Sequence, residues 1–342
     1  MLGDGIIGHK RQKKLLQKSL DRNRVPSAYL FCGPEEIGKK LLALNFLKFF
    51  FCRGNKGCGA CVNCKKMEQG NHPDLFCLSG HAGPIKIDEL RLIQKHLRFH
   101  PFEAPRKVCL IDDADRMTAA AQSAFLKTLE EPSASTLFIL VSGKADLLLP
   151  TIRSRCQTVN FGRIPREMIT LCLIRQHGME EAEARVVAAV ANGSLAKALK
   201  EDRELYISDR IKLIEDVDAL PDAADNVLPH LQLAQRLSEK KGSQEARLEL
   251  LQLYFRDVLF LLEGRTEADL INIDLVDIIR RRAERETSDS VLARLEALRE
   301  TGLALAGNAN LRLTLDVLLM RLSRPADHAG GQFSISTNGK VQ

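Results

Sequence analysis

The stretch Gly33-Pro-Glu-Glu-Ile-Gly38-Lys39-Lys40 decides the fold, because it is a phosphate-binding loop in the setting that such a loop requires. An apolar run at 28–32 precedes it, and an apolar segment begins at Leu41. Strand, loop and helix thus follow one another in the order that lets backbone N–H groups wrap phosphates. The sequence predicts an α/β P-loop domain whose nucleotide site includes Gly33, Gly38 and Lys39.

The same loop lacks a group that hydrolysis needs. In a working loop the residue after the lysine is Ser or Thr, whose hydroxyl binds Mg²⁺, and here it is Lys40. Unless they point to solvent, Glu35 and Glu36 also repel a phosphate at about 6 Å by roughly 2–3 kcal/mol per charge pair at an effective dielectric near 20. The loop indicates an NTPase fold that has lost, or nearly lost, hydrolysis, with weak ATP or ADP binding left open.

Composition is that of a protein with two or three domains. The 342 residues are 45% hydrophobic and 27% charged, and the net charge of +6 allows nucleic-acid contact without requiring it. We see neither a membrane-spanning apolar segment nor a signal-peptide pattern, so we expect a cytoplasmic protein with no membrane partner. The nine cysteines, four of them clustered, suit a reducing compartment with a metal site.

Short apolar runs alternate with amphipathic segments from residue 8 to about 161, which is typical of a parallel sheet between helices. Asp88 and Thr118 are expected to cap two of these helices. Beyond Pro165 the strand pattern does not return, and helical spacing continues to about 325. The expected strands lie at 28–32, 75–78, 108–112, 136–142 and 157–161.

Domain boundaries follow from this change of pattern. Residues 1–163 are expected to form the nucleotide-binding-like domain, with a cysteine module at 52–64. Short helices at 164–206 and a larger all-α block at 207–325 follow, and the tail at 326–342 is expected to be disordered because it has few large apolar residues.

A cluster of cysteines in a glycine-containing loop predicts a structural zinc site. The spacing is C-x5-C-x2-C-x2-C, and four thiolates leave no open coordination position for catalysis. An iron–sulfur cluster is an alternative, although Glu68 stands where its fourth cysteine would fall, and reduced thiols without metal are another. The predicted ligands are Cys52, Cys58, Cys61 and Cys64.

Carboxylates follow the apolar strand that begins at Val108. At the carboxyl end of a strand beside the phosphate loop, Asp112 would hold Mg²⁺ or its water, and Asp113 would orient the attacking water. Hydrolysing proteins of this class usually have Glu at the second position, so Asp113 is one methylene short. Taken alone, these acids could also be a helix cap.

Arg155 lies in the triplet Ser154-Arg155-Cys156 just before an expected strand. An exposed arginine is most often a solvated surface charge. Ring-forming ATPases, however, carry an arginine at this place that reaches into the site of the neighbouring subunit. A guanidinium suits that task because it is always charged and binds phosphate oxygens as a fork.

These motifs together resemble the clamp-loader branch of the AAA+ ATPases. The resemblance is dense over about 5–163 and looser to about 325, and the cysteine insert is similar to that of bacterial clamp-loader subunits. The chain departs from the motor subunits, tau and gamma, at Lys40, Asp113 and Ala196. The residues that carry it are Gly33–Lys39, Asp112–Asp115, 126–132 and Ser154–Cys156.

The resemblance implies an AAA+ domain, a helical lid at 164–206 and a helical collar at 207–325 that assembles a five-subunit loader with delta and the motor subunits. Such a loader places the ring-shaped sliding clamp on primer-template DNA. This chain would be a stator that contributes Arg155 in trans to ATP on a motor subunit. Ser142 would occupy the place of the polar residue that senses the γ-phosphate.

Other readings remain at this point. The main alternative is an ATP-hydrolysing subunit of the tau/gamma type that uses Lys39, Asp112 and Asp113 itself. A helicase-type ring motor usually needs an intact site in every copy, and a zinc-containing α/β adaptor needs none.

Overall fold

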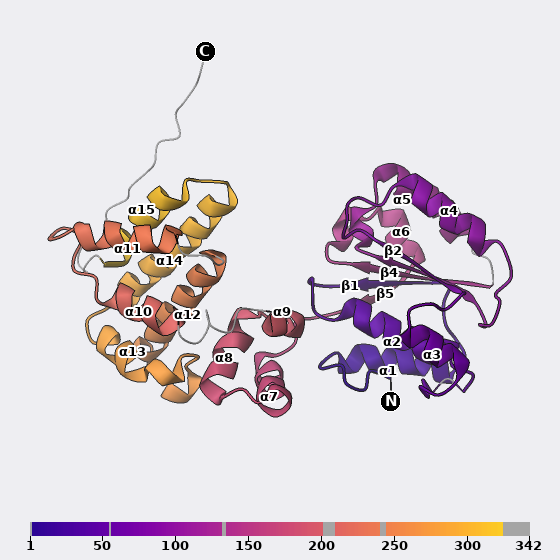
Figure 1. Ribbon diagram of the computed structural model, residues 1–342, viewed down its shortest axis with the longest axis horizontal. Helices are drawn as coiled ribbons and strands as arrows, with labels where there is room; N and C mark the ends of the chain where they lie inside the picture. The colour runs from indigo at the N-terminus through magenta and orange to yellow at the C-terminus, as the bar shows by residue number, and fades with distance from the viewer. Residues whose placement is uncertain (1, 55, 132–134, 201–208, 240–243, 324–342) are drawn as a thin grey trace, which may run out of the picture. The chain divides into compact units, whose positions relative to one another are not determined.

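A five-stranded parallel sheet, in the order β2-β3-β4-β1-β5, forms the centre of the N-terminal part of this computed structural model (Figure 1). The structure describes residues 2–54, 56–131, 135–200, 209–239 and 244–323. Strands β3 and β4 are buried along their whole length, because helices cover both faces of the sheet. The strands are β1 (Ala28–Cys32), β2 (Leu75–Ser79), β3 (Lys107–Asp112), β4 (Thr136–Ser142) and β5 (Gln157–Asn160).

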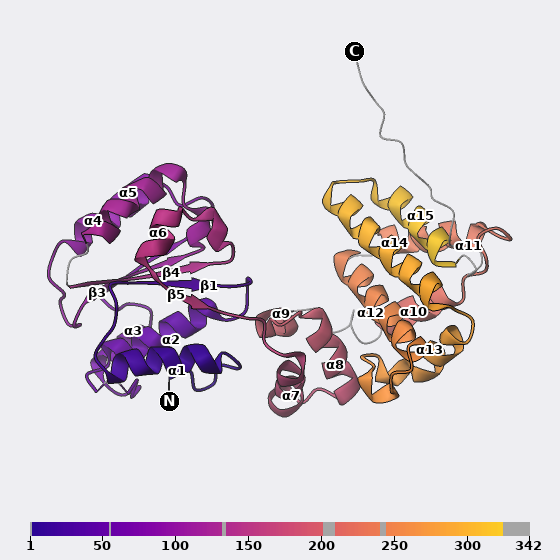
Figure 2. The same ribbon diagram turned by 180° about the vertical axis from the view of Figure 1, so that it is seen from behind.

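Alternating side chains of the strands build one core on each face of the sheet. Tyr29 and Phe31 of β1 pack with Phe46 beneath the helices α1 (Lys10–Asp21), α2 (Lys39–Phe51) and α3 (Val62–Glu68). Leu30 packs with Phe125 beneath α4 (Ile87–Leu97), α5 (Ala119–Glu130) and α6 (Pro150–Arg155). Figures 1 and 2 show these two groups of helices on opposite sides of the sheet. The predicted parallel α/β arrangement is therefore confirmed.

Two helix caps were predicted, and one of them is wrong. Thr118 caps α5, since its hydroxyl accepts the backbone N–H of Ala121 at 3.2 Å. Asp88 instead lies inside α4, whose N-cap is Lys86. The carboxylate of Glu89 accepts the backbone N–H of Lys86 at 2.8 Å, so the competing acidic residue one position later satisfies the helix end.

The chain divides into two compact units, 1–169 with 191–200 and 170–190 with 201–342. The expected lid at 164–206 is thus shared between them, and the boundary falls inside α7 (Arg166–His177). Helix α9 (Leu195–Lys200) belongs to the first unit and α8 (Glu181–Val190) to the second. The expected tail at 326–342 lies outside the described residues.

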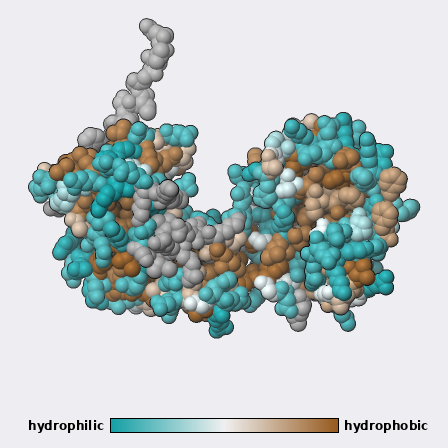
Figure 3. Space-filling view, viewed as in Figure 1, coloured by the Kyte–Doolittle hydropathy of each residue, from teal (hydrophilic) through white to brown (hydrophobic). Residues whose placement is uncertain are grey.

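Helices alone make up the described part of the second unit. Tyr254, Phe255, Leu298 and Leu319 are central to its core. On the face drawn in Figure 3, hydrophilic and hydrophobic residues are interspersed, and within the described residues no helix is both long and apolar enough to cross a membrane. Besides α8 and the part of α7 from Thr170 onward, the helices are α10 (Arg210–Asp218), α11 (Leu228–Glu239), α12 (Gln244–Leu262), α13 (Val276–Ala283), α14 (Ser288–Ala306) and α15 (Leu311–Ser323), with short 3-10 turns at Glu267–Asp269 and Ile273–Leu275.

A buried carboxylate joins β2 to the segment that leads into β3. Asp74 has no exposed surface, and its oxygens accept the backbone N–H groups of Phe102, Glu103 and Ala104 at 2.8, 2.8 and 2.9 Å. Burial alone would raise the pKa of Asp74, but these hydrogen bonds outweigh it and hold the pKa below its ordinary value. The ionised carboxylate therefore stabilises the folded state.

We predict that Asp74→Ala lowers the free energy of unfolding by about 2–4 kcal/mol at pH 7, because three backbone N–H groups lose their hydrogen bonds to a buried, charged acceptor. The folded-state pKa is depressed, so the stabilisation is complete above the unfolded pKa of about 3.9 and is lost as the pH falls through the folded pKa. Urea denaturation at pH 7 and at low pH measures the difference. The exposed Asp88→Ala is the control, and a wild-type advantage that is the same at both pH values would contradict the prediction.

Candidate functional site

The phosphate-binding loop lies between β1 and α2, as predicted. Gly33 has no room for a side chain, since a Cβ there would lie 2.2 Å from the carbonyl oxygen of Phe161. Gly38 is the N-cap of α2 in the left-handed conformation, with φ 93°, and a Cβ there would meet nothing within 4 Å. The loop is therefore closed against the protein at Gly33 and open at Gly38, at the helix end that favours anions.

Lys39 is buried, and its ammonium is bound by the loop itself. It donates to the carbonyl oxygen of Gly33 at 2.7 Å and also to that of Pro34. Burial lowers the pKa of Lys39, while the carboxylates of Glu35 and Asp112 act in the opposite direction. Glu35 and Glu36 are both exposed. The side chain of Glu35 lies close to Gly143, since a Cβ added to Gly143 would be 2.8 Å from the Cγ of Glu35.

Lys40 forms an ion pair that the sequence did not reveal. Its Nζ lies 2.9 Å from Oδ2 of Asp112, whose side chain is 7% exposed, whereas that of Lys40 is 46% exposed. In a working site a Ser or Thr hydroxyl and this acid serve the same Mg²⁺ ion. Here an ammonium replaces the hydroxyl and binds the acid directly. Lys40, the residue that departs from the motif, therefore also occupies the carboxylate of Asp112, which would otherwise serve the Mg²⁺ ion.

His81 approaches both aspartates at the end of β3. Its Nε2 lies 3.6 Å from Oδ2 of Asp112, and its Nδ1 lies 3.3 Å from Oδ2 of Asp113, which has a left-handed φ of 51°. Sequence reasoning missed His81. The position of His81 just after β2 could have indicated this contact, because the strand register places Ser79, the last residue of β2, beside Asp112. Ligand atoms of these three residues lie within 4.8 Å of one another.

Ser142 at the end of β4 binds another carboxylate. Its Oγ donates to Oδ1 of Asp115 at 2.5 Å, and the same oxygen accepts the backbone N–H of Gly143 at 3.1 Å. Burial would raise the pKa of Asp115, but the hydrogen bond from Ser142 and those from the backbone lower it. The hydroxyl at the place where the resemblance implies a phosphate-sensing residue is thus engaged within the chain.

Arg155 ends α6 on the face of the sheet covered by α4 and α5. Its NH2 lies 2.9 Å from Oε1 of Glu130, and its NH1 donates to the carbonyl oxygen of Thr151 at 3.1 Å. The side chain remains 37% exposed. Arg153 on the same helix is 38% exposed and pairs with Asp146 at 2.8 Å. The two arginines therefore differ in partner more than in exposure.

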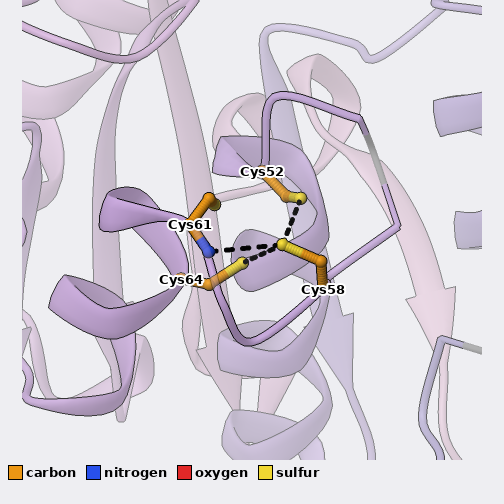
Figure 4. A group of neighbouring side chains, drawn as sticks. All are labelled: Cys52, Cys58, Cys61 and Cys64. Carbon is orange, nitrogen blue, oxygen red and sulfur yellow. Dashed lines mark hydrogen bonds between the residues drawn. The ribbon is translucent and has the colours of Figure 1, made fainter.

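The four cysteines converge although they come from different elements. Cys52 follows α2, Cys61 is the N-cap of α3, Cys64 lies within α3, and Cys58 lies in the loop between them (Figure 4). The sulfur of Cys58 is 3.7 Å from that of Cys52 and 4.0 Å from that of Cys64. A tetrahedron of thiolates with metal–sulfur bonds of about 2.3 Å has sulfur–sulfur edges of about 3.8 Å. The group can therefore hold one metal ion.

The thiols of this group differ in their readiness to ionise. Burial opposes ionisation of Cys52, but hydrogen bonds from the backbone of Cys58, Gly54 and Lys56 lower its pKa to about 6. Burial raises the pKa of Cys64 to about 12. Glu68, which stands at the place of a possible further ligand, lies 2.6 Å from the ammonium of Lys48. Among the described residues, the group that could hold a metal ion here thus consists of the four cysteine sulfurs.

Comparison with known proteins gives the family. The model of the DNA polymerase III delta subunit family matches residues 8–165, and that of its C-terminal part matches 206–324. The DNA polymerase III subunit delta' of Bacillus subtilis is 34% identical over 91% of this chain and 95% of that protein. This chain belongs to the DNA polymerase III delta' subunit family. It is a clamp-loader subunit, as the motifs predicted.

Other relatives of this delta' family chain match it with a lower identity or over a smaller share of their length. The tau subunit of B. subtilis is 27% identical over 93% of this chain and 61% of that protein. The delta' subunit of Escherichia coli is 31% identical over 54% of this chain and 57% of that protein. A gamma-subunit-related protein from Thermotoga maritima matches as a structure with TM-score 0.42 and 18% identity, over 91% of this chain and 98% of that one.

We predict that Lys40→Ala lowers the free energy of unfolding by about 1–3 kcal/mol, because it leaves the buried carboxylate of Asp112 without its ammonium; the cost stays below that of a fully buried pair since Lys40 is half exposed. Asp112→Asn in the same chain should restore part of the loss. Urea denaturation of both single variants and the double variant measures this coupling. Lys95→Ala, at an exposed site in α4, is the control, and strictly additive effects would contradict the prediction.

Proposed function

We propose that this delta' family chain is the stator of the replicative clamp loader. It supplies Arg155 in trans to the ATP site of a neighbouring tau/gamma motor subunit while the loader places the sliding clamp on primer-template DNA. The other partners are the delta subunit and the clamp. The chain acts in the cytoplasm as a component of the DNA polymerase III holoenzyme, with 164–206 as lid and 207–325 as collar.

The ion pair between Lys40 and Asp112 carries the proposal. A site that hydrolyses ATP needs the acid at the end of β3 for Mg²⁺ or its water. In this chain that carboxylate is bound to an ammonium at 2.9 Å, and the hydroxyl ligand is absent from the motif. The chain's own site, formed by Gly33, Gly38, Lys39 and the polar residues around them, is therefore silent or binds ATP or ADP weakly.

Arg155 has the chemistry that a neighbour's site requires. A guanidinium carries a permanent charge and five N–H donors, and the two contacts to Glu130 and Thr151 leave others for phosphate oxygens. Such an arginine stabilises the charge that develops on the transferred phosphoryl group, an effect of about 10³–10⁵ in rate in related systems. The stator thereby contributes to catalysis without hydrolysing ATP itself.

The tau/gamma-type motor remains the other candidate. It would need Asp112 to exchange Lys40 for a metal ion. The ion pair at 2.9 Å supports the stator instead.

We predict that Arg155→Ala lowers clamp- and DNA-stimulated ATP turnover of a reconstituted loader by at least about 10²-fold, because transition-state charge loses its counterion. Steady-state turnover with each variant measures the effect. Arg153→Ala is the matched control, since it lies on the same helix with equal exposure and a partner of its own.

Gel filtration should show that both variants join the mixed loader, which separates a catalytic loss from a loss of assembly. Unchanged turnover with Arg155→Ala would remove the arginine from the neighbour's site. An equal fall with Arg153→Ala would assign the effect to the charge of α6 as a whole. Recovery of this chain as a ring of identical copies would instead favour a helicase-type motor.

We further propose that the four cysteines hold a structural Zn²⁺ ion. Four sulfur donors suit zinc, and the distances from the Cys58 sulfur to those of Cys52 and Cys64, 3.7 and 4.0 Å, are close to the edge of a tetrahedron of thiolates. Two of the cysteines lie at or inside helix ends, so the ion would tie the loop after α2 to α3. Zinc would stabilise this part of the fold and take no part in ATP chemistry.

We predict one zinc per chain, lost in Cys58→Ser and kept in Cys77→Ser, whose cysteine is exposed in the same unit. Chelation should lower the melting temperature of the first unit and leave the helices of the second folded, because the ligands all lie in the first. Metal analysis and circular dichroism measure both effects. Iron with visible absorbance would establish a cluster, and an unchanged melt would show that the ion stabilises nothing.

A further inference from the structure

A carboxylate of the same chain holds the guanidinium of Arg155. Glu130 is the last residue of α5, and its Oε1 lies 2.9 Å from NH2 of Arg155. We propose that Glu130 is a positioning residue, which fixes the direction in which Arg155 presents its remaining N–H groups to a phosphate of the neighbouring subunit. This inference rests on the proposed function.

The two helices that carry the pair are fixed to each other. The side chain of Gln122 in α5 accepts the backbone N–H of Leu149 at 2.8 Å and donates to the carbonyl oxygen of Leu147 at 3.3 Å. Ile152 of α6 packs in the same buried core as Phe125 of α5. The backbones of Glu130 and Arg155 therefore keep a constant separation, and the contact between their side chains restricts the long arginine side chain.

Two acceptors act on two different nitrogens of Arg155. Glu130 binds NH2, and the carbonyl oxygen of Thr151, one turn earlier in α6, binds NH1. Because the guanidinium is planar, two fixed contacts determine the orientation of its plane. Without the Glu130 contact, the side chain of Arg155 would lose conformational freedom when it binds the phosphate. That loss of entropy weakens binding in the transition state.

The neighbouring pair on α6 gives an internal comparison. Arg153 and Asp146 are 2.8 Å apart, but Asp146 is 98% exposed, whereas Glu130 is 50% exposed. Pairs this open to solvent contribute little to stability, so neither carboxylate is needed for folding. A specific effect of Glu130 on turnover would thus arise from Arg155 and not from the stability of the chain.

The test measures ATP turnover by the reconstituted loader with full-length variants of this chain. Glu130→Ala should lower kcat about 3- to 10-fold with little change in KM for ATP, which is the size of effect expected from freeing one long side chain. Glu130→Gln should lose less, because its amide oxygen still accepts from NH2. Asp146→Ala should leave kcat unchanged, and Glu130→Ala added to Arg155→Ala should cause no further loss.

Each outcome separates the two proposals. If Arg155→Ala itself leaves turnover unchanged, the proposed function fails. If Arg155→Ala lowers turnover while Glu130→Ala leaves turnover unchanged or raises it, only the positioning role is overturned. Glu130 then either has no effect on Arg155 or holds it away from the phosphate. A further loss in the double variant, or an equal loss with Asp146→Ala, would also overturn it. Melting curves and gel filtration confirm that every variant folds and assembles.

Discussion

Parallel pairing of five strands sends all their carboxyl ends to one edge of the sheet, and the chemistry of the first unit depends on that constraint. The register sets Cys32 at the end of β1 beside Ser142 at the end of β4, and Ser79 beside Asp112. Residues distant in sequence thus share one rim with the loop that opens α2. Side chains at this rim then determine whether it can hold a nucleotide.

Charged side chains at this rim already have polar partners within the chain. Lys39 is bound by loop carbonyls, Lys40 by Asp112, and Asp115 by a hydroxyl and backbone N–H groups. A bound nucleotide with Mg²⁺ would have to replace several of these contacts. The fold has therefore kept the shape of a phosphate site, while the charged side chains of that site stabilise the protein itself. Arg155 lies apart from these contacts, at the end of α6 on the face of the sheet covered by α4 and α5.

Local patterns predicted the strands, their parallel class, the cysteine group and the cap at Thr118, because each follows from residues close in sequence. The expected ends of β2, β3 and β5 differed by one residue, where an end depends on pairing with a neighbour. The cap at Asp88 was wrong because Glu89 satisfies the helix end from a position that spacing does not distinguish. His81 near Asp112, Lys40 on Asp112, and Glu130 on Arg155 were missed, since no local pattern reports which distant side chains meet.

The ammonium of Lys40 also differs from a metal ion in permanence. Mg²⁺ and nucleotide come and go, so the charge of an ordinary site changes through each cycle of turnover. A lysine side chain is covalently attached, and neither a chelator nor a change in the concentration of magnesium removes it. The charge that Lys40 places beside Asp112 therefore stays the same whatever the magnesium concentration, and in the proposed stator it would stay the same through each round of hydrolysis at the neighbouring site.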